Sequence, residues 1–414
     1  MSLWRNRDFM LLQTGQLLST AGTQTTAIAY PLVALAVTHS PAKAGLVAFA
    51  RFVPHAAFGL LAGVAADRWN RKRQMIAADG VRAVAMASLG ATILFDPGAF
   101  WPIAVVGFVE GTGSAFFSAA YAGALRAVVP PRQLPAAAGA QGARQATVML
   151  AGPPLGGALF GIGRAVPFVV DALSYAFSFL SLLAMRTPFQ EAREADPARL
   201  RSQLAEGFRF LWSQPFLRTC AFVYALGNFA GPGVLFVLIV VGRRQGLSGG
   251  EVGALTAAFG ACLLVGSLAS PLFRRAFSMR TILRIELWAW LGPAVFLVWP
   301  SVYVLTVGIL PVAVAIPVTD SVVNGYRLAM TPDRLLGRVE SVRSTISLLL
   351  APLGPLVAGL LLSSVSARTT IAVFAACGLV LALWGTLSPS IRNAPSLSEL
   401  DGLPVRGASP AAAE

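Results

Sequence analysis

Long apolar runs, separated by short polar breaks, follow one another along nearly the whole chain. A bilayer core about 30 Å thick is crossed by roughly 20 consecutive apolar residues in a helix. Because lipid offers no hydrogen bonds to the backbone, each run of this length is expected to form a transmembrane helix. The predicted spans are residues 10–37, 44–66, 74–95, 101–124, 138–162, 166–185, 215–241, 251–273, 281–299, 302–325, 339–362 and 369–388.

Composition agrees with this pattern. Of the 414 residues, 56% are apolar and 12% are charged, and the mean hydropathy is +0.69. A water-soluble domain carries about 25% charged residues. The fold class predicted from these data is an all-α membrane protein with twelve transmembrane helices.

Positive charges fall mainly in alternate connections between the spans. The net charge is +14, which in a soluble protein would suggest nucleic-acid binding. Here the charges lie on one side of the membrane, and the opposite connections hold only Lys43, Arg164, Arg243, Arg244 and Arg368. By the positive-inside rule, both termini and the central connection are expected in the cytoplasm, and nucleic acid is not expected as a partner.

The spans divide the chain into two halves. Residues 1–185 and 215–388 each hold six spans, residues 186–214 connect them, and residues 389–414 are a Pro-, Ala- and Ser-rich tail expected to be disordered. In the connection, Leu200, Leu204, Phe208 and Leu211 recur at helical spacing after Asp196-Pro197, a pair typical of a helix start. An amphipathic helix on the cytoplasmic face is therefore predicted there.

The two halves resemble each other at a separation of about 202 residues. Gly63, Arg71 and Lys72 correspond to Gly266, Arg274 and Arg275; Pro131 and Leu134 to Pro332 and Leu335; Gly152, Pro153 and Gly157 to Gly354, Pro355 and Gly359. An even number of spans separates the copies, so both halves run in the same sense through the membrane. Such parallel repeats place a binding site between the halves, near the membrane midplane.

The connection after the second span carries a distinctive motif, formed by Gly63, Asp67, Arg68, Arg71 and Lys72. This pattern resembles the G-x-x-x-D-R-x-x-R-K signature of the major facilitator superfamily, which implies the major facilitator fold and a cytoplasmic latch at this loop. A plain cluster of membrane-stop charges would explain the cations but neither Asp67 nor Gly63. Asp67 suits a latch because helix N-termini attract negative charge.

The fifth span contains Gly139, Gly152, Pro153, Gly156 and Gly157. Their spacing resembles the exporter motif of the same superfamily, with Val148 in place of one glycine. The alternative is generic close packing of small residues between helices.

Three further stretches, residues 4–9, 170–175 and 336–339, resemble the bacterial macrolide- and enterobactin-exporter branch. The resemblance covers about residues 4–388 and implies a bacterial inner-membrane protein. One departure concerns proton coupling: many drug/proton antiporters carry R-x-x-Q-G in the fourth span, where this chain has Gly107, Glu110 and Gly111. Coupling to H⁺ therefore cannot be inferred from that motif.

Four polar residues are candidates for a substrate and proton cavity, because the resemblance implies that spans 1, 4, 7 and 10 line it. They are Gln24, Glu110, Asn228 and Asp320, one on each of these spans. A buried carboxylate can take up a proton near neutral pH, as proton-driven exchange requires. The alternative for each acid is a structural hydrogen bond to a neighbouring helix.

Other charges within the spans have simpler interpretations. Asp79 and Arg82 are one helical turn apart and are expected to form a structural ion pair. Asp171 lies near the outer end of its span and is interpreted as a solvated cap. Arg51 also lies near the outer end of its span.

The sequence offers little for catalysis. Neither the two histidines nor the three cysteines are spaced as metal ligands, and no P-loop motif occurs. No catalytic residue, metal or cofactor is expected, and a membrane-embedded lipid enzyme is disfavoured. The functional prediction is a monomeric secondary transporter that exports a drug-like, siderophore-like or amphipathic small molecule by alternating access, with H⁺ as the expected coupling ion. An importer of a small metabolite, and a receptor or regulator without transport, remain alternatives.

Overall fold

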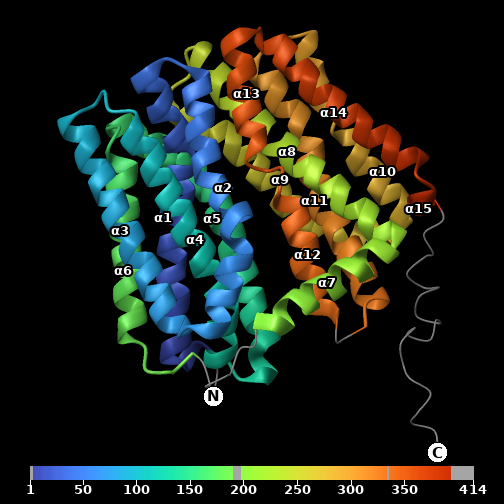
Figure 1. Cartoon of the computed structure of the whole chain (residues 1–414). Coiled ribbons are helices and arrows are strands. Elements are labelled where there is room, and N and C mark those ends of the chain that lie inside the picture. Colours follow the sequence, from blue (N-terminus) through green and yellow to red (C-terminus); the bar gives the residue numbers. More distant parts are fainter. Residues whose placement is uncertain (1–2, 190–196, 333–334, 393–414) are drawn as a thin grey trace, which may run out of the picture. The chain divides into compact units, whose positions relative to one another are not determined.

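Every predicted span is helical in the computed structural model, which describes residues 3–189, 197–332 and 335–392 (Figure 1). The first six long helices are α1 (Arg7–Thr38), α2 (Pro41–Arg68), α3 (Arg71–Phe95), α4 (Trp101–Val128), α5 (Leu134–Ile162) and α6 (Val166–Ala184). They are followed by α7 (Pro197–Ser213), α8 (Pro215–Arg244), α9 (Gly249–Ala276), α10 (Met279–Ala289), α11 (Val302–Met330), α12 (Leu336–Leu348), α13 (Leu353–Ser364), α14 (Ala367–Leu387) and α15 (Pro389–Arg392). Short 3₁₀ helices occupy Leu3–Arg5, Pro131–Gln133 and Gly292–Leu297. Helix α7 lies where the linker helix was predicted.

Nine helical segments in the described part of the chain are long and apolar enough to cross a membrane. Helices α1 and α5 are not among them because polar residues and glycines lower their mean hydropathy, and α10 is not because it has only 11 residues. Five buried polar residues of α1 are Gln13, Gln16, Ser19, Thr25 and Thr26. Such side chains belong in a protein interior and not against lipid.

Two predicted spans are interrupted helices. Helix α10 ends at Ala289, four residues before Pro293, and continues as a 3₁₀ helix. Helices α12 and α13 are separated by a turn at residues 349–352, which ends with Pro352. Proline lacks a backbone N–H and its ring clashes with the carbonyl group four residues earlier, so it breaks a helix unless its neighbours compensate. The sequence had predicted one continuous helix in each place.

The chain divides into two compact units, and each is described by itself. Unit 1 comprises Met1–Ala195, Pro232–Ala261 and Pro352–Thr370, and unit 2 comprises Asp196–Gly231, Cys262–Ala351 and Ile371–Glu414. Unit 1 thus contains α1 to α6 together with parts of α8 and α9, all of α13 and the start of α14. This division differs from that of the two sequence halves, whose assignment as domains remains a prediction.

The N-terminal segment fastens three helices of unit 1 together. The side chain of Asn6 caps α1 by accepting hydrogen bonds from the backbone N–H groups of Asp8 and Phe9, and its Nδ2 donates to the Val128 carbonyl oxygen at 2.9 Å. The Asp8 Oδ2 accepts from the backbone N–H groups of Arg186, at 3.1 Å, and Thr187, at 2.7 Å. The start of α1 is therefore tied to the ends of α4 and α6.

The internal repeat is visible in two equivalent contacts within unit 1. A Cβ on Gly157 of α5 would overlap the carbonyl oxygen of Gly249 at the start of α9. A Cβ on Gly359 of α13 would overlap the carbonyl oxygen of Pro41 at the start of α2, and would approach the Cα of Gly45. Gly157 and Gly359 are counterparts in the repeat, and so are the starts of α2 and α9. The predicted pseudo-symmetry is confirmed by these matched contacts.

These contacts predict a position-specific cost for larger side chains. Gly359→Leu should destabilise the protein by about 1–3 kcal/mol, because the added atoms must push α13 from α2. The thermal unfolding midpoint of purified protein in detergent would measure this loss.

Gly161→Leu on α5 is the matched control, since a Cβ there would meet nothing within 4 Å. Its midpoint should be unchanged or slightly higher, because leucine favours a helix more than glycine does. Equal losses in both variants would contradict the packing argument.

Candidate functional site

Five charged side chains lie inside the bundle formed by α1 to α6. They are Arg51 on α2, Asp79 and Arg82 on α3, Glu110 on α4 and Asp171 on α6. A charge at the centre of a bilayer costs about 3 kcal/mol on insertion scales, so each requires a partner or a function. In this bundle the charges are held by ion pairs, hydrogen bonds and a cation–π contact.

Arg51 and Glu110 form the central ion pair. The Arg51 Nε lies 2.8 Å from the Glu110 Oε2, and the two side chains are 11% and 2% exposed. The Tyr175 hydroxyl donates to the other carboxylate oxygen at 3.0 Å. The Arg51 Nη2 donates to the Thr23 carbonyl oxygen at 3.1 Å. Both charged groups are thus satisfied across four helices, α1, α2, α4 and α6.

Asp171 lies on α6 beside this pair but is held differently. Its residue is 0% exposed, and its two oxygens accept hydrogen bonds from the hydroxyls of Thr26, at 2.9 Å, and Ser174, at 3.1 Å. Within residues 3–189, 197–332 and 335–392, no ion pair to Asp171 is formed. Its carboxyl group is therefore surrounded by hydroxyl donors and has no cation at ion-pairing distance.

The hydroxyl groups of one threonine and one tyrosine link α1 to the charged groups. The Thr23 Oγ1 and the Tyr175 hydroxyl oxygen are 2.8 Å apart. Tyr175 also lies beneath the Arg82 guanidinium, which is 4.3 Å from its ring centroid. Arg82 in turn forms the ion pair with Asp79 that the sequence predicted.

One interpretation from sequence was wrong, because Asp171 is fully buried and is not a solvated cap. Glu110 has partners on neighbouring helices, as the alternative from sequence allowed. Its cation, Arg51, lies on another helix and 59 residues away in sequence, so spacing along one helix could not reveal it. The stretch 170–175 was the part of the sequence that could have indicated these buried polar contacts, because it contains both Asp171 and Tyr175.

The remaining candidate cavity residues are only partly buried and lie in different units. Gln24, in unit 1, faces α5, where a Cβ on Gly152 would overlap its side chain. Asn228, in unit 2, donates from Nδ2 to the Ser347 carbonyl oxygen at 2.9 Å, next to the break between α12 and α13. Asp320, on α11, also belongs to unit 2. The shared cavity lined by Gln24, Glu110, Asn228 and Asp320 remains a prediction.

The loop between α2 and α3 is fastened by two of its cations. The Arg71 Nε donates to the Ala66 carbonyl oxygen at 3.0 Å, and the Arg71 Nη2 lies 3.4 Å from the Asp67 Oδ1. The Lys72 Nζ donates to the Met185 carbonyl oxygen at 2.6 Å. Gly63 has open space around it. These contacts join the loop to the end of α6, and the latch role of Gly63, Asp67, Arg68, Arg71 and Lys72 remains a prediction.

The glycines of α5 occupy close approaches between helices, with one exception. A Cβ on Gly156 would overlap the Thr25 backbone of α1, as Gly152 and Gly157 would overlap Gln24 and Gly249. A Cβ on Gly139 would meet nothing within 4 Å. The motif therefore seats α5 against α1 and α9.

The three stretches that suggested an exporter branch each have a structural role. Asn6 and Asp8 fasten α1, and Asp171 and Tyr175 belong to the buried set of charges. Arg338, on α12, forms an ion pair with Glu206 of α7. These stretches therefore hold helices together.

Comparison with known proteins decides the family. The model of the Major Facilitator Superfamily matches residues 13–287, which is more than half of the chain. The chain belongs to the Major Facilitator Superfamily. It is a multi-pass membrane transporter and not an enzyme.

Relatives of this superfamily member include named efflux proteins. The multidrug efflux pump Tap of Mycolicibacterium fortuitum is 27% identical over 410 residues, covering 95% of this chain and 97% of the pump. The macrolide efflux protein A of Streptococcus pyogenes is 24% identical over 318 residues, covering 75% of this chain and 78% of that protein. The predicted resemblance to the efflux branch is confirmed by these matches.

Solved structures of the superfamily share the fold. A bacterial homologue of the human lysosomal transporter Spinster aligns with a TM-score of 0.72 and 18% identity, over 94% of this chain and 97% of that one. The nucleoside transporter NupG aligns with a TM-score of 0.70 and 14% identity, over 94% of this chain and all of that one, 100%. At these identities the likeness establishes the twelve-helix architecture alone.

The central ion pair predicts a double-mutant cycle. Arg51→Met and Glu110→Gln should each destabilise the transporter by about 3–5 kcal/mol, because each leaves a buried group without its partner. The double variant should lose much less than the sum of the two. Thermal unfolding in detergent would measure all three.

The ion pair of Arg71 and Asp67, which is more exposed, provides a comparison for the stability losses at Arg51 and Glu110. Asp67→Asn should cost less than about 1 kcal/mol, since Asp67 is 65% exposed. Additive losses at Arg51 and Glu110 would show that the two groups do not stabilise each other.

Proposed function

We propose that this transporter exports drug-like or amphipathic small molecules from a bacterial cell by alternating access, in exchange for H⁺. The observation that carries the proposal is the relationship to the Tap pump, which extends over 95% of this chain and 97% of the pump. A relationship of that extent includes both six-helix halves, and both are needed to build a site between parallel repeats.

The direction of transport is inferred from the relatives and from α5. Both relatives described above are named for efflux. The spacing of Gly139, Gly152, Pro153, Gly156 and Gly157 resembles the superfamily's exporter motif. The close contact of Gly157 with α9 gives that motif a defined place at one end of the bundle.

Coupling to H⁺ is inferred from the buried acids of the N-terminal bundle. Asp171 is held by hydroxyl groups, which can hydrogen-bond either to a carboxylate or to a carboxylic acid. A proton on Glu110 would remove the charge that holds Arg51, and would free the guanidinium to move. Uptake of one proton by either acid would therefore change the forces among α1, α2, α4 and α6.

The substrate is proposed to meet the four polar residues predicted from the sequence, Gln24, Glu110, Asn228 and Asp320. Acidic and amide groups in an apolar surround suit an amphipathic or cationic solute. The proposed setting is the inner membrane, with both termini in the cytoplasm, and the proposed unit of function is the monomer.

Reconstituted transport would test direction and coupling together. In proteoliposomes, ethidium and a macrolide should be moved against their gradients when a pH gradient is imposed, and should only equilibrate without one. Glu110→Gln and Asp171→Asn should lose most of the acceleration by the pH gradient while retaining equilibration. Asp96→Asn, in the exposed connection before α4, should retain the wild-type response.

Several outcomes would contradict the proposal. Full acceleration in both acid variants would remove these acids as the coupling groups. Transport unaffected by pH in the wild type would remove H⁺ as the coupling ion. Net movement only in the inward direction would favour an importer, and binding without transport would favour a receptor.

A further inference from the structure

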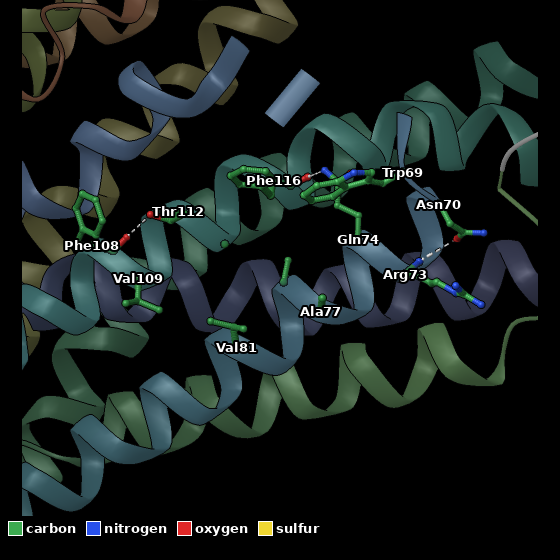
Figure 2. Close-up of a pocket in the computed structure, with 12 residues that line it drawn as sticks. Trp69, Asn70, Arg73, Gln74, Ala77, Val81, Phe108, Val109, Thr112 and Phe116 are labelled. Atoms are coloured by element: carbon green, nitrogen blue, oxygen red, sulfur yellow. Dashed lines mark hydrogen bonds between the residues drawn. The ribbon is translucent and has the colours of Figure 1, made fainter. Parts of the chain in front are cut away.

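A groove with a volume of about 680 Å³ lies between α3 and α4 (Figure 2). Its walls come from the α2–α3 connection, α3 and α4, all of which belong to unit 1. Figure 2 shows Asn70 and Arg73 at one end of the groove, and Phe108 and Val109 at the other. The volume is within the range of small-molecule sites, about 300–1,000 Å³.

The groove is mainly apolar, and two of its polar groups are bonded within the protein. The Gln74 Nε2 donates to the Phe116 carbonyl oxygen at 2.8 Å, and the Thr112 hydroxyl donates to the Phe108 carbonyl oxygen at 2.8 Å. Small residues, Ala78 and Gly113, line its buried side. Most of the remaining wall is hydrocarbon, which suits an apolar occupant, although the buried Gln74 Oε1 accepts no hydrogen bond within the described residues.

The length of the groove matches one leaflet of a bilayer. Arg73 and Val81 both line it on α3, and eight residues of helix rise by about 12 Å. Half of a hydrocarbon core of about 30 Å is about 15 Å. The groove therefore runs from the membrane surface at the α2–α3 connection to near the midplane, over the depth occupied by one acyl chain.

Of the cations near the surface end of the groove, Arg73 lines it, and Arg68 directly precedes the lining residue Trp69. Arg71 and Lys72 are engaged with Asp67 and with backbone carbonyl groups, as described above. The side chains of Arg68 and Arg73 are exposed, and neither forms an ion pair within the described part of the chain. Trp69 lies between them in sequence and is 61% exposed, as is typical of a tryptophan at a membrane surface.

We propose that this groove binds one anionic glycerophospholipid, with an acyl chain between α3 and α4 and its phosphate on Arg68 and Arg73. The apolar groove of one-leaflet depth complements the acyl chain. The exposed cations Arg73, which lines the groove, and Arg68, which adjoins Trp69, complement the phosphate. The proposal rests on the membrane fold and is independent of efflux or H⁺ coupling. Basic clusters beside transmembrane helices attract anionic lipid with about 1 kcal/mol per cation.

Native mass spectrometry of the detergent-purified transporter, titrated with phosphatidylglycerol, would test the proposal. The wild type should retain one tightly bound phosphatidylglycerol and bind phosphatidylcholine more weakly. Arg68→Gln and Arg73→Gln should each weaken retention of phosphatidylglycerol about fivefold, the equivalent of about 1 kcal/mol. Val81→Trp, which fills the groove, should weaken both lipids.

Matched controls separate this site from general effects. Arg126→Gln removes an exposed cation on α4 outside the groove, and Val84→Trp adds the same bulk to α3 at an exposed position that does not line it. Both should bind phosphatidylglycerol as the wild type does. The arginine variants keep the test valid if Val81→Trp fails to fold.

Three results would overturn the proposal. An equal loss in Arg126→Gln and Arg73→Gln would show attraction by net charge alone. Unchanged binding in folded Val81→Trp would show that no chain occupies the groove. A loss of ethidium transport in Val81→Trp, measured in pure phosphatidylcholine vesicles with lipid retention unchanged, would make the groove a substrate entrance instead.

Discussion

Hydrocarbon neither solvates a charge nor hydrogen-bonds to a backbone group, and the helices of this transporter are arranged around that constraint. In the N-terminal bundle it forces the charged side chains to find partners, either on another helix or one turn away on the same helix. Arg51 meets Glu110, Arg82 meets Asp79, and Asp171 is held by the hydroxyls of Thr26 and Ser174. The polar surface of α1 follows from the same constraint, because this helix supplies hydroxyl and carbonyl partners to its neighbours.

The parts of the fold that follow from local pattern could be predicted from the sequence. Apolar runs located the helices, and small residues at a constant separation located the repeat. The partner of Glu110 could not be predicted, because it depends on how α2 and α4 are rotated about their own axes. That rotation is set by side-chain packing, for example where the Arg51 carbonyl oxygen passes close to Gly111. The periodicity of a sequence gives the positions of residues on one helix, whereas an ion pair between helices also depends on how the two helices face each other.

Proline shows a second limit of sequence patterns. Pro54 lies within α2, and Pro153 and Pro154 lie within α5, and these helices continue through them. Pro293 and Pro352 instead follow the ends of α10 and α12. At the break after α12, the Asn228 side chain donates to the Ser347 carbonyl oxygen, which the interruption leaves without a helical partner. This tertiary contact could not be read from the apolar pattern.

The paired glycine contacts at Gly157 and Gly359 have a mechanical consequence. Main chain lies directly against main chain at these two points, so no side chain stands between the two backbones there. Parting the helices at these points therefore requires no rotamer change of an intervening side chain. Side chains engage only beside them, as where the backbone N–H of Ala42 donates to the Ser363 hydroxyl at 2.9 Å.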